Sequence, residues 1–254
     1  MCYDINTSTQ TQALRAFKKF GLKAVEEINE NLEELTDLPL FHASGFSHPE
    51  LLIYTDRSPD FPEVATWGLI PHWIRDEEQM KTFWNNTLNA RGETIFEKPS
   101  FRESANNHRC LIYIDGFYEH HHYNKKTYPF YIQRNDGKPI VLAGLWSEWK
   151  NPETNGLINS FSIVTTEANT MMAKIHNNPK IKSPRMPLIL PEILEDEWLK
   201  PIDDEMDEKS IKELIQSFPE DHLKAHTVRK LRGKDYIGNV EEIAQEFIYE
   251  DLEF

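Results

Sequence analysis

Cysteines and long hydrophobic runs are scarce in this sequence, and each scarcity excludes a class of protein. Only Cys2 and Cys110 occur among its 254 residues, and two distant cysteines make neither a disulfide framework nor a four-cysteine zinc site. No apolar run approaches the ~20 residues of a membrane span, and the N-terminus lacks the features of a signal peptide. We therefore expect a cytoplasmic protein that does not associate with membranes.

Positive charge is also scarce, because 28 Lys and Arg residues stand against 42 Asp and Glu, a net charge of −14. The imbalance is concentrated at one end: residues 192–254 carry a net charge of −11, and residues 1–191 only −3. Binding to nucleic acid responds to local potential rather than to total charge. The composition therefore does not exclude DNA as a partner.

The spacing of apolar residues predicts one helix and a series of short strands before residue 192. Residues 9–21 have apolar side chains at helical spacing and end on Gly21. Six runs rich in aromatic and β-branched residues, separated by turn sequences such as "NDGK", indicate a mostly antiparallel sheet: 51–56, 109–122, 128–134, 139–149, 160–168 and 185–190.

Residues 192–254 change character, with three acidic segments at helical spacing that we expect to pack on the outside. The sequence contains neither an internal repeat nor a low-complexity linker, which favours one α+β domain with a helical C-terminal appendage. We place the domain at residues 1–233 and an acidic helix, packed on it, at residues 234–254.

Cys2 has a chemical possibility that Cys110, expected as a small buried strand residue, lacks. A small second residue favours removal of Met1, which makes cysteine the first residue of the mature chain. An α-amine, with a pKa of about 8, attacks an aldehyde to give an imine, and a neighbouring thiol then closes a five-membered thiazolidine. The N-terminus is thus a candidate aldehyde trap; the alternative is that Cys2 has no chemical role.

The segment "NARGET" is dense in polar groups. Asn89 can donate and accept hydrogen bonds, and Arg91 and Glu93 lie at alternate positions of an extended segment. The alternative is a solvated loop with a local ion pair.

The strand that ends in "IDGFYEHHH" places a carboxyl group among aromatic residues. Burial there can raise the pKa of Glu119 into the range of a general acid. Metal binding by His120, His121 and His122 is disfavoured, because consecutive strand residues point to opposite faces. We expect no metal site.

The segment "AKIHNNPKIKSPRMPLIL" combines an imidazole with several cations. His176 ends a short helical pattern and can transfer protons near neutral pH. Arg185 directly precedes a strand, and with Lys180 and Lys182 it forms the densest basic run of residues 1–191.

Taken together, these elements resemble one known family, the SOS-response-associated peptidases, also described as abasic-site processing proteins. The matching elements are Met1-Cys2, "WGLIPHW", "NARGET" followed by "KPSFRES", "RCLIYIDGFYEH", "AGLW", "FSIVTTEAN", "AKIH" and "RMPLIL". They occur in the family's order from residue 1 to about residue 191, and chance agreement over so many separated motifs is improbable.

The resemblance implies a curled, barrel-like, mostly antiparallel sheet with flanking helices, and a partner, single-stranded DNA with abasic sites. It implies that Cys2 captures the lesion's aldehyde as a thiazolidine crosslink, oriented by Asn89, with Glu119 and His176 transferring protons. It further implies DNA contacts by Trp67, which stacks on or wedges between bases, and by Arg91 and Arg185. We also expect Lys182, in the basic run, to contact DNA. No cofactor is implied, and we expect a monomer.

Three departures from the family pattern bear on the site. Tyr3 and Asp4 stand where members usually continue Gly-Arg, so a phosphate-binding arginine is missing and Asp4 is expected to repel the DNA backbone. His120 replaces the tryptophan that often follows the glutamate. The insertion "NNPKIKSP" between His176 and Arg185 either displaces one of them or adds cationic contacts.

Two other functions remain as alternatives. One is an N-terminal-nucleophile hydrolase in which Cys2 attacks peptide carbonyls, although no oxyanion arrangement is evident in the sequence. The other is a non-catalytic single-strand binding module that uses Trp67 and the arginines.

Overall fold

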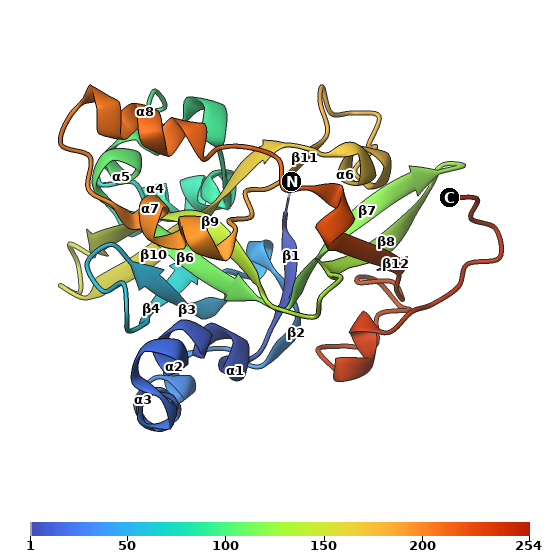
Figure 1. Ribbon diagram of the computed structural model, residues 1–254, viewed down its shortest axis with the longest axis horizontal. Coiled ribbons are helices and arrows are strands. Elements are labelled where there is room, and N and C mark those ends of the chain that lie inside the picture. The colour runs from blue at the N-terminus through green and yellow to red at the C-terminus, as the bar shows by residue number, and fades with distance from the viewer. Residues whose placement is uncertain (1) are drawn as a thin grey trace.

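The computed structural model describes residues 2–254, whose strands form two sheets (Figure 1). The first is antiparallel, with the strand order β12-β8-β7-β1-β2. Its strands are β1 (Asp4–Thr7), β2 (Leu40–Ser44), β7 (Gly116–Tyr123), β8 (Lys126–Arg134) and β12 (Leu223–Thr227). The N-terminal strand β1 is therefore paired on both edges.

The second sheet contains a closed five-stranded barrel. Its ring runs β10-β4-β3-β6-β9 and closes because β9 also pairs with β10. The strands are β3 (Glu50–Thr55), β4 (Glu63–Trp67), β6 (Arg109–Ile114), β9 (Ile140–Lys150) and β10 (Leu157–Glu167). Beyond the ring, β10 also pairs with β5 (Asn89–Arg91) and β11 (Arg185–Pro187). The expected α+β class, with a barrel-like and mostly antiparallel sheet, is confirmed.

Short helices flank the two sheets. The α-helices are α1 (Thr9–Gln12), α2 (Leu14–Phe20), α3 (Leu22–Asn31), α4 (Glu77–Phe83), α5 (Arg102–Asn107), α6 (Thr170–Ile175), α7 (Glu195–Leu199) and α8 (Glu205–Glu213). The 3-10 turns are η1 (Glu33–Leu35), η2 (Gly45–Ser47), η3 (Trp84–Thr87), η4 (Gly92–Thr94), η5 (Glu192–Leu194), η6 (Glu220–His222) and η7 (Glu241–Ala244). No helix within residues 2–254 has the length and apolar content needed to cross a bilayer.

The helix predicted for residues 9–21 forms as α1 and α2. The Ser8 side chain accepts a hydrogen bond from Thr11 N at the start, and Gly21 ends α2 with a positive φ of 74°. The predicted strands also form, with the run 109–122 divided at Asp115 into β6 and β7. Strands β1, β2, β4, β5 and β12 were not predicted, because they are short and carry polar residues.

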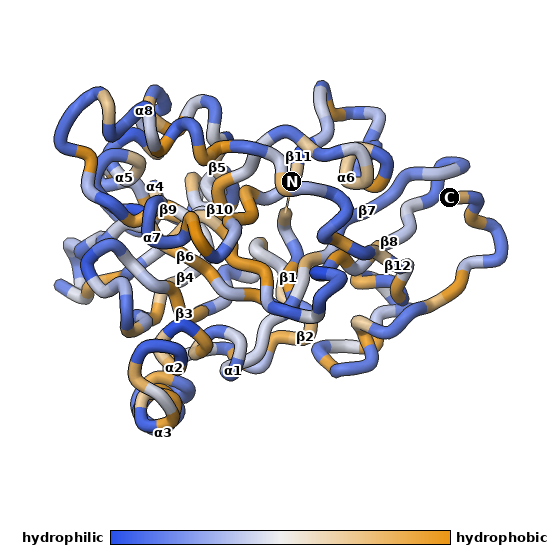
Figure 2. Tube along the Cα trace, viewed as in Figure 1, coloured by the Kyte–Doolittle hydropathy of each residue, from blue (hydrophilic) through white to orange (hydrophobic). Residues whose placement is uncertain are grey.

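The hydrophobic core extends through the barrel and into the first sheet. Figure 2 shows hydrophobic residues gathered along the barrel strands and hydrophilic residues in the surrounding loops. Trp67, Phe161 and Ile112 of the barrel share one buried cluster with Phe117 of β7 and with Cys2. The N-terminal residue that carries the predicted chemistry is therefore part of the core.

The acidic helix expected at residues 234–254 is not present. Only the turn η7 is helical there, and the rest runs over β8 and β12 as an irregular strap. Ile243 packs in a cluster with Tyr131, whereas Phe254 reaches Phe130 at 4.6 Å between ring centres. A helix rises only about 1.5 Å per residue and presents its apolar side chains along one stripe. The strap instead spreads them over separate sites on the sheet.

The segments before the strap are integral to the core. Trp198 of α7 is completely buried, and its Nε1 donates to the carbonyl oxygens of Cys110 and Gly144 in the barrel, each at 3.2 Å. Arg109 Nε in turn donates to the carbonyl oxygen of Trp198 at 2.8 Å. Helix α7 therefore packs against β6 and β9 of the barrel.

We expect Trp198→Ala to lower the free energy of unfolding by about 3–5 kcal/mol, because it leaves a large cavity against the barrel. Urea denaturation measures the change. Ile193→Ala, on the adjacent turn η5 where the side chain is 85% exposed, is the matched control and should shift stability by less than ~0.5 kcal/mol. Equal effects of the two substitutions would mean that α7 is a detachable appendage.

Candidate active site

Cys2 lies two residues before β1 and is held where the two sheets meet. Asp4 pairs with Tyr118 of β7, and the antiparallel register brings the chain before Asp4 beside Glu119. Cys2 is completely buried, and its carbonyl oxygen accepts a 2.8 Å hydrogen bond from Asn89 Nδ2. Asn89 belongs to β5 of the second sheet, whereas Cys2 is attached to β1 of the first sheet. Cys2 is therefore held by both sheets.

Burial controls the ionisation of the Cys2 thiol. Loss of hydration raises the pKa of the thiol far above its ordinary value, and the neighbouring charge of Glu119 raises the pKa further. The thiol is therefore protonated at neutral pH and needs a proton acceptor before its sulfur can form a bond.

Glu119 and His176 approach Cys2 from different elements. Glu119 lies on β7 with its side chain buried, and its Oε1 accepts a 2.9 Å hydrogen bond from the backbone N–H of His120. His176 follows α6 and is also buried; this burial lowers the pKa of the imidazole, while Glu119 acts in the opposite direction. Since the charge of Glu119 acts on both Cys2 and His176, the site brings a cysteine together with two titratable side chains of the kind that can transfer protons.

The insertion after His176 does not displace it from Arg185. Residues 177–184 form a loop between α6 and β11, and His176 Nδ1 lies 3.0 Å from both the backbone nitrogen and the backbone oxygen of Arg185. Lys180 and Lys182 are exposed on this loop. The insertion therefore keeps the imidazole in place and adds cations at the rim of the site.

The extended end of β10 holds both predicted phosphate-binding arginines. Arg91 of β5 pairs in register with Thr165, is exposed, and lies near enough to Tyr3 to oppose the burial-driven rise in the pKa of its phenol. Arg185 of β11 is buried, with Nη2 at 2.7 Å from Glu93 Oε2 and 2.8 Å from the carbonyl oxygen of Thr165. Arg91 is therefore exposed at this edge, whereas the guanidinium of Arg185 is buried and paired with Glu93.

Trp67 lies inside the barrel. Its ring is completely buried against Phe161, and its Nε1 donates a 2.9 Å hydrogen bond to the carbonyl oxygen of Leu88. The expectation that Trp67 stacks on or wedges between bases does not fit this position, because the ring has no exposed face. Near Cys2 the exposed aromatic side chain is Phe46, which packs on Tyr3 at 4.9 Å between ring centres.

A cavity of about 390 Å³ opens beside Cys2. It is lined by Tyr3, Glu119, His120, His122, Thr127, His176, Asn178, Ile181, Lys230, Leu231 and Arg232. Lys230 and Arg232 were missed by the sequence reasoning, although "RKLRGK" (229–234) is a basic run inside the acidic C-terminal quarter. No three His, Cys, Asp or Glu side chains of residues 2–254 are grouped as metal ligands.

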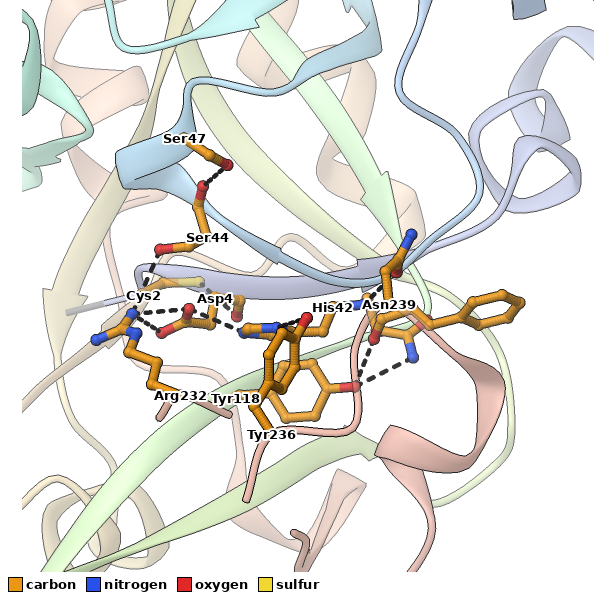
Figure 3. A network of polar contacts seen from close by, with 11 residues as sticks. Cys2, Asp4, His42, Ser44, Ser47, Tyr118, Arg232, Tyr236 and Asn239 are labelled. Atoms are coloured by element: carbon orange, nitrogen blue, oxygen red, sulfur yellow. Dashed lines mark hydrogen bonds and ion pairs between the residues drawn. The ribbon is translucent and has the colours of Figure 1, made fainter. Parts of the chain in front are cut away.

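Asp4 is the centre of a polar network that joins β1, β2 and the C-terminal strap (Figure 3). Arg232 Nη2 lies 2.9 Å from each carboxylate oxygen, and His42 Nε2 lies 3.1 Å from Oδ1. His42 Nδ1 contacts the Tyr236 hydroxyl at 2.9 Å, and His42 N donates to Asn239 Oδ1 at 3.0 Å.

Burial and neighbouring groups act in opposite directions on the ionisation of Asp4. Burial alone would raise its pKa, but the hydrogen bond from His42 and the charge of Arg232 outweigh burial, and the pKa lies below its ordinary value. The Asp4 carboxylate, which was expected to repel DNA, is thus charged, but its charge is paired with Arg232 and it is hydrogen-bonded to His42.

The chain resembles named relatives and solved structures. It is 34% identical over 212 residues to the abasic site processing protein YoqW of Bacillus subtilis, covering 80% of this chain and 88% of that protein. It is 29% identical over 153 residues to the abasic site processing protein HMCES of Xenopus tropicalis, covering 53% of this chain and 43% of that protein. A crystal structure of a Bacteroides thetaiotaomicron protein superposes with a TM-score of 0.81 at 32% identity, covering 97% of this chain and 100% of that one.

The family comparison agrees with the geometry of the site. The model of the SOS response associated peptidase (SRAP) family matches residues 1–234, a range that includes Cys2, Asn89, Glu119, His176 and Arg232. The likeness thus covers both sheets and all the residues that line the cavity. The chain belongs to the SRAP family.

Proposed function

We propose that this protein binds single-stranded DNA at abasic sites and forms a thiazolidine crosslink between Cys2 and the abasic-site aldehyde. The observation that carries the proposal is the burial of Cys2 beside Glu119 and His176, with Asn89 bound to its carbonyl oxygen. The relatives named abasic site processing proteins support the choice of substrate.

The first step uses the α-amine of Cys2 rather than its thiol. That amine exists only after removal of Met1, which lies outside the described residues. Burial keeps the thiol protonated, whereas an α-amine with an ordinary pKa of about 8 is partly in the free-base form at neutral pH. The amine attacks the aldehyde carbon, and the resulting carbinolamine carries the former carbonyl oxygen as a hydroxyl group.

The second step removes water to form an imine. The nitrogen loses a proton and the hydroxyl group gains one, so a group that first accepts and then donates suffices. His176 fits this role, because its lowered pKa leaves the imidazole largely neutral at pH 7 and able to accept a proton.

The third step closes the ring. The thiol sulfur bonds to the imine carbon, the C=N electron pair moves to nitrogen, and the thiol proton is transferred to that nitrogen. Glu119 is near enough to raise the pKa of the thiol and is the proposed carrier of this proton. The step needs neither an oxidant nor a cofactor.

Asn89 offers a second contact to the mature N-terminus. Its Oδ1 is buried and has no hydrogen-bond partner within residues 2–254, although its Nδ2 binds the carbonyl oxygen of Cys2. A buried unsatisfied acceptor costs about 1–3 kcal/mol. The α-amine of Cys2 can satisfy this acceptor, so Asn89 would orient both ends of the nucleophilic residue.

Arg91 and Lys182 are exposed at the rim and are the proposed phosphate contacts.

The alternative functions have less support. A peptide hydrolase needs a preorganised donor for an oxyanion, and Asn89 Nδ2 is already bound within the protein. A non-catalytic binding module relied on Trp67, which is buried.

We expect wild-type protein lacking Met1 to form an adduct with an abasic oligonucleotide that survives a denaturing gel without reductant. Cys2→Ala keeps the α-amine but not the ring-closing thiol, so its imine should be trapped only with borohydride. Cys110→Ala is the matched control and should retain the stable adduct. Intact mass confirms removal of Met1, and a stable unreduced adduct with Cys2→Ala would contradict the thiazolidine mechanism.

We expect Glu119→Gln and His176→Ala each to slow crosslinking by roughly 10²-fold or more, as loss of a proton-transfer group commonly does. The wild-type rate should fall as the pH drops through the lowered pKa of His176, because protonation removes the acceptor. His176→Ala should lose the part of the dependence that comes from the imidazole and keep the part that comes from protonation of the α-amine.

Single-turnover rates from pH 5 to 8 provide the measurement, and His72→Ala, at an exposed position, is the control. If Glu119→Gln and His176→Ala both react at the wild-type rate across this range, these two groups do not transfer the protons.

A further inference from the structure

A segment anchored in the core holds Arg232 beside the active site. Val228 and Leu231 are buried, and Leu231 packs in the cluster that contains Tyr118 of β7. Lys230 donates a hydrogen bond to the backbone oxygen of Thr127 in β8. Packing as well as the ion pair to β1 therefore sets the position of Arg232.

The guanidinium of Arg232 is only partly used by the protein. Its Nη2 contacts both carboxylate oxygens of Asp4 at 2.9 Å and the hydroxyl of Ser44 at 3.3 Å. A guanidinium has five N–H donors on three nitrogens, and within residues 2–254 neither Nε nor Nη1 has a hydrogen-bond partner.

The ion pair is asymmetric in its exposure. The Arg232 side chain is 56% exposed and the Asp4 side chain 4%. The buried carboxylate also accepts from His42, so its negative charge is turned into the protein. The exposed part of the ion pair is therefore the positively charged guanidinium. An approaching anion responds to this local charge rather than to the neutral sum of the pair.

The exposed end of Arg232 lines the same cavity as Glu119 and His176. Arg91 approaches the site on β5 of the barrel sheet, whereas Arg232 approaches on the segment packed against the first sheet. Two cations thus lie near the site on different sheets: Arg91 close to Tyr3, and Arg232 at the cavity. A DNA strand that crosses the site can meet one cation on each side of the lesion.

We propose that Arg232 binds a backbone phosphate of the DNA strand next to the abasic site, through an N–H group of Nη1 or Nε. The inference rests on the proposed function. A hydrogen bond from arginine to phosphate is charge-assisted and strong, and Asp4 and Ser44 hold the guanidinium in orientation before DNA arrives, which limits the entropy lost on binding. Under this proposal, Asp4 orients the guanidinium of Arg232 toward the DNA strand.

The test uses protein lacking Met1, titrated with an unmodified single-stranded oligonucleotide at several salt concentrations. Arg232→Gln should weaken binding about 3- to 10-fold at low salt and lower the slope of log Kobs against log[salt] by ~0.7, the value for one lost phosphate contact. Arg232→Lys keeps the charge and should retain most of the slope, with weaker binding because one ammonium cannot serve Asp4 and a phosphate equally well.

The matched control is Arg229→Gln, which makes the same charge change three residues earlier. Arg229 is exposed, stacks on Phe247 at 4.7 Å, and does not line the cavity. Its slope should change by less than half as much. A wild-type slope in Arg232→Gln, or an equal change in Arg229→Gln, would overturn the proposal.

Thermal unfolding and crosslinking separate the remaining explanations. If Arg232 only tied the strap to β1, its loss would lower Tm without changing the salt slope, and the proposal would be wrong. With an abasic oligonucleotide, Arg232→Gln should raise the half-saturating DNA concentration more than it lowers the rate at saturation. Failure of the wild type to crosslink would instead contradict the proposed function, while the slope on unmodified DNA would still test Arg232.

Discussion

Strand β1 is hydrogen-bonded to β7 on one edge and β2 on the other, and the position of Cys2 depends on that pairing. A chain terminus is ordinarily among the most mobile parts of a protein, but here the second residue is completely buried. The same burial that orders Cys2 also keeps its thiol protonated. The fixed position of Cys2 and the low thiolate content of its side chain therefore have the same cause, which is burial. In the proposed mechanism this favours an attack that starts at the α-amine, with the sulfur reacting only in ring closure.

Placing β1 inside the sheet also brings Asp4 into the interior, where an unpaired carboxylate is costly. The structure meets this cost with His42 from β2 and Arg232 from the C-terminal segment. Residues at opposite ends of the chain thus stabilise one another. The segment after β12 is consequently part of the site, and the acidic C-terminal quarter cannot be understood as a separate appendage.

The sequence was sufficient for the α+β class, most long strands and the grouping of Cys2, Asn89, Glu119 and His176, because alternation and family motifs carry that information. It was not sufficient for Trp67, since the motif does not say which face of β4 is buried. It also failed for the strap, where apolar residues at helical spacing bind separate sites on the sheet. The pairing of Asp4 with Arg232 spans 228 residues, and no local pattern reports so distant a contact.

The charge distribution gives this arrangement a consequence for DNA binding. With a net charge of −14, the protein as a whole repels a polyanion, and the repulsion is strongest at low salt, where the Debye length is long. The cations near Cys2 act over a shorter range, and Arg232 is exposed while its partner Asp4 is buried. Under the proposed function, attraction of DNA would therefore come from the few cations around the cavity rather than from the protein as a whole. Under the proposed function, undamaged strands would dissociate readily, and retention would come from the covalent bond at the lesion rather than from a broad basic surface.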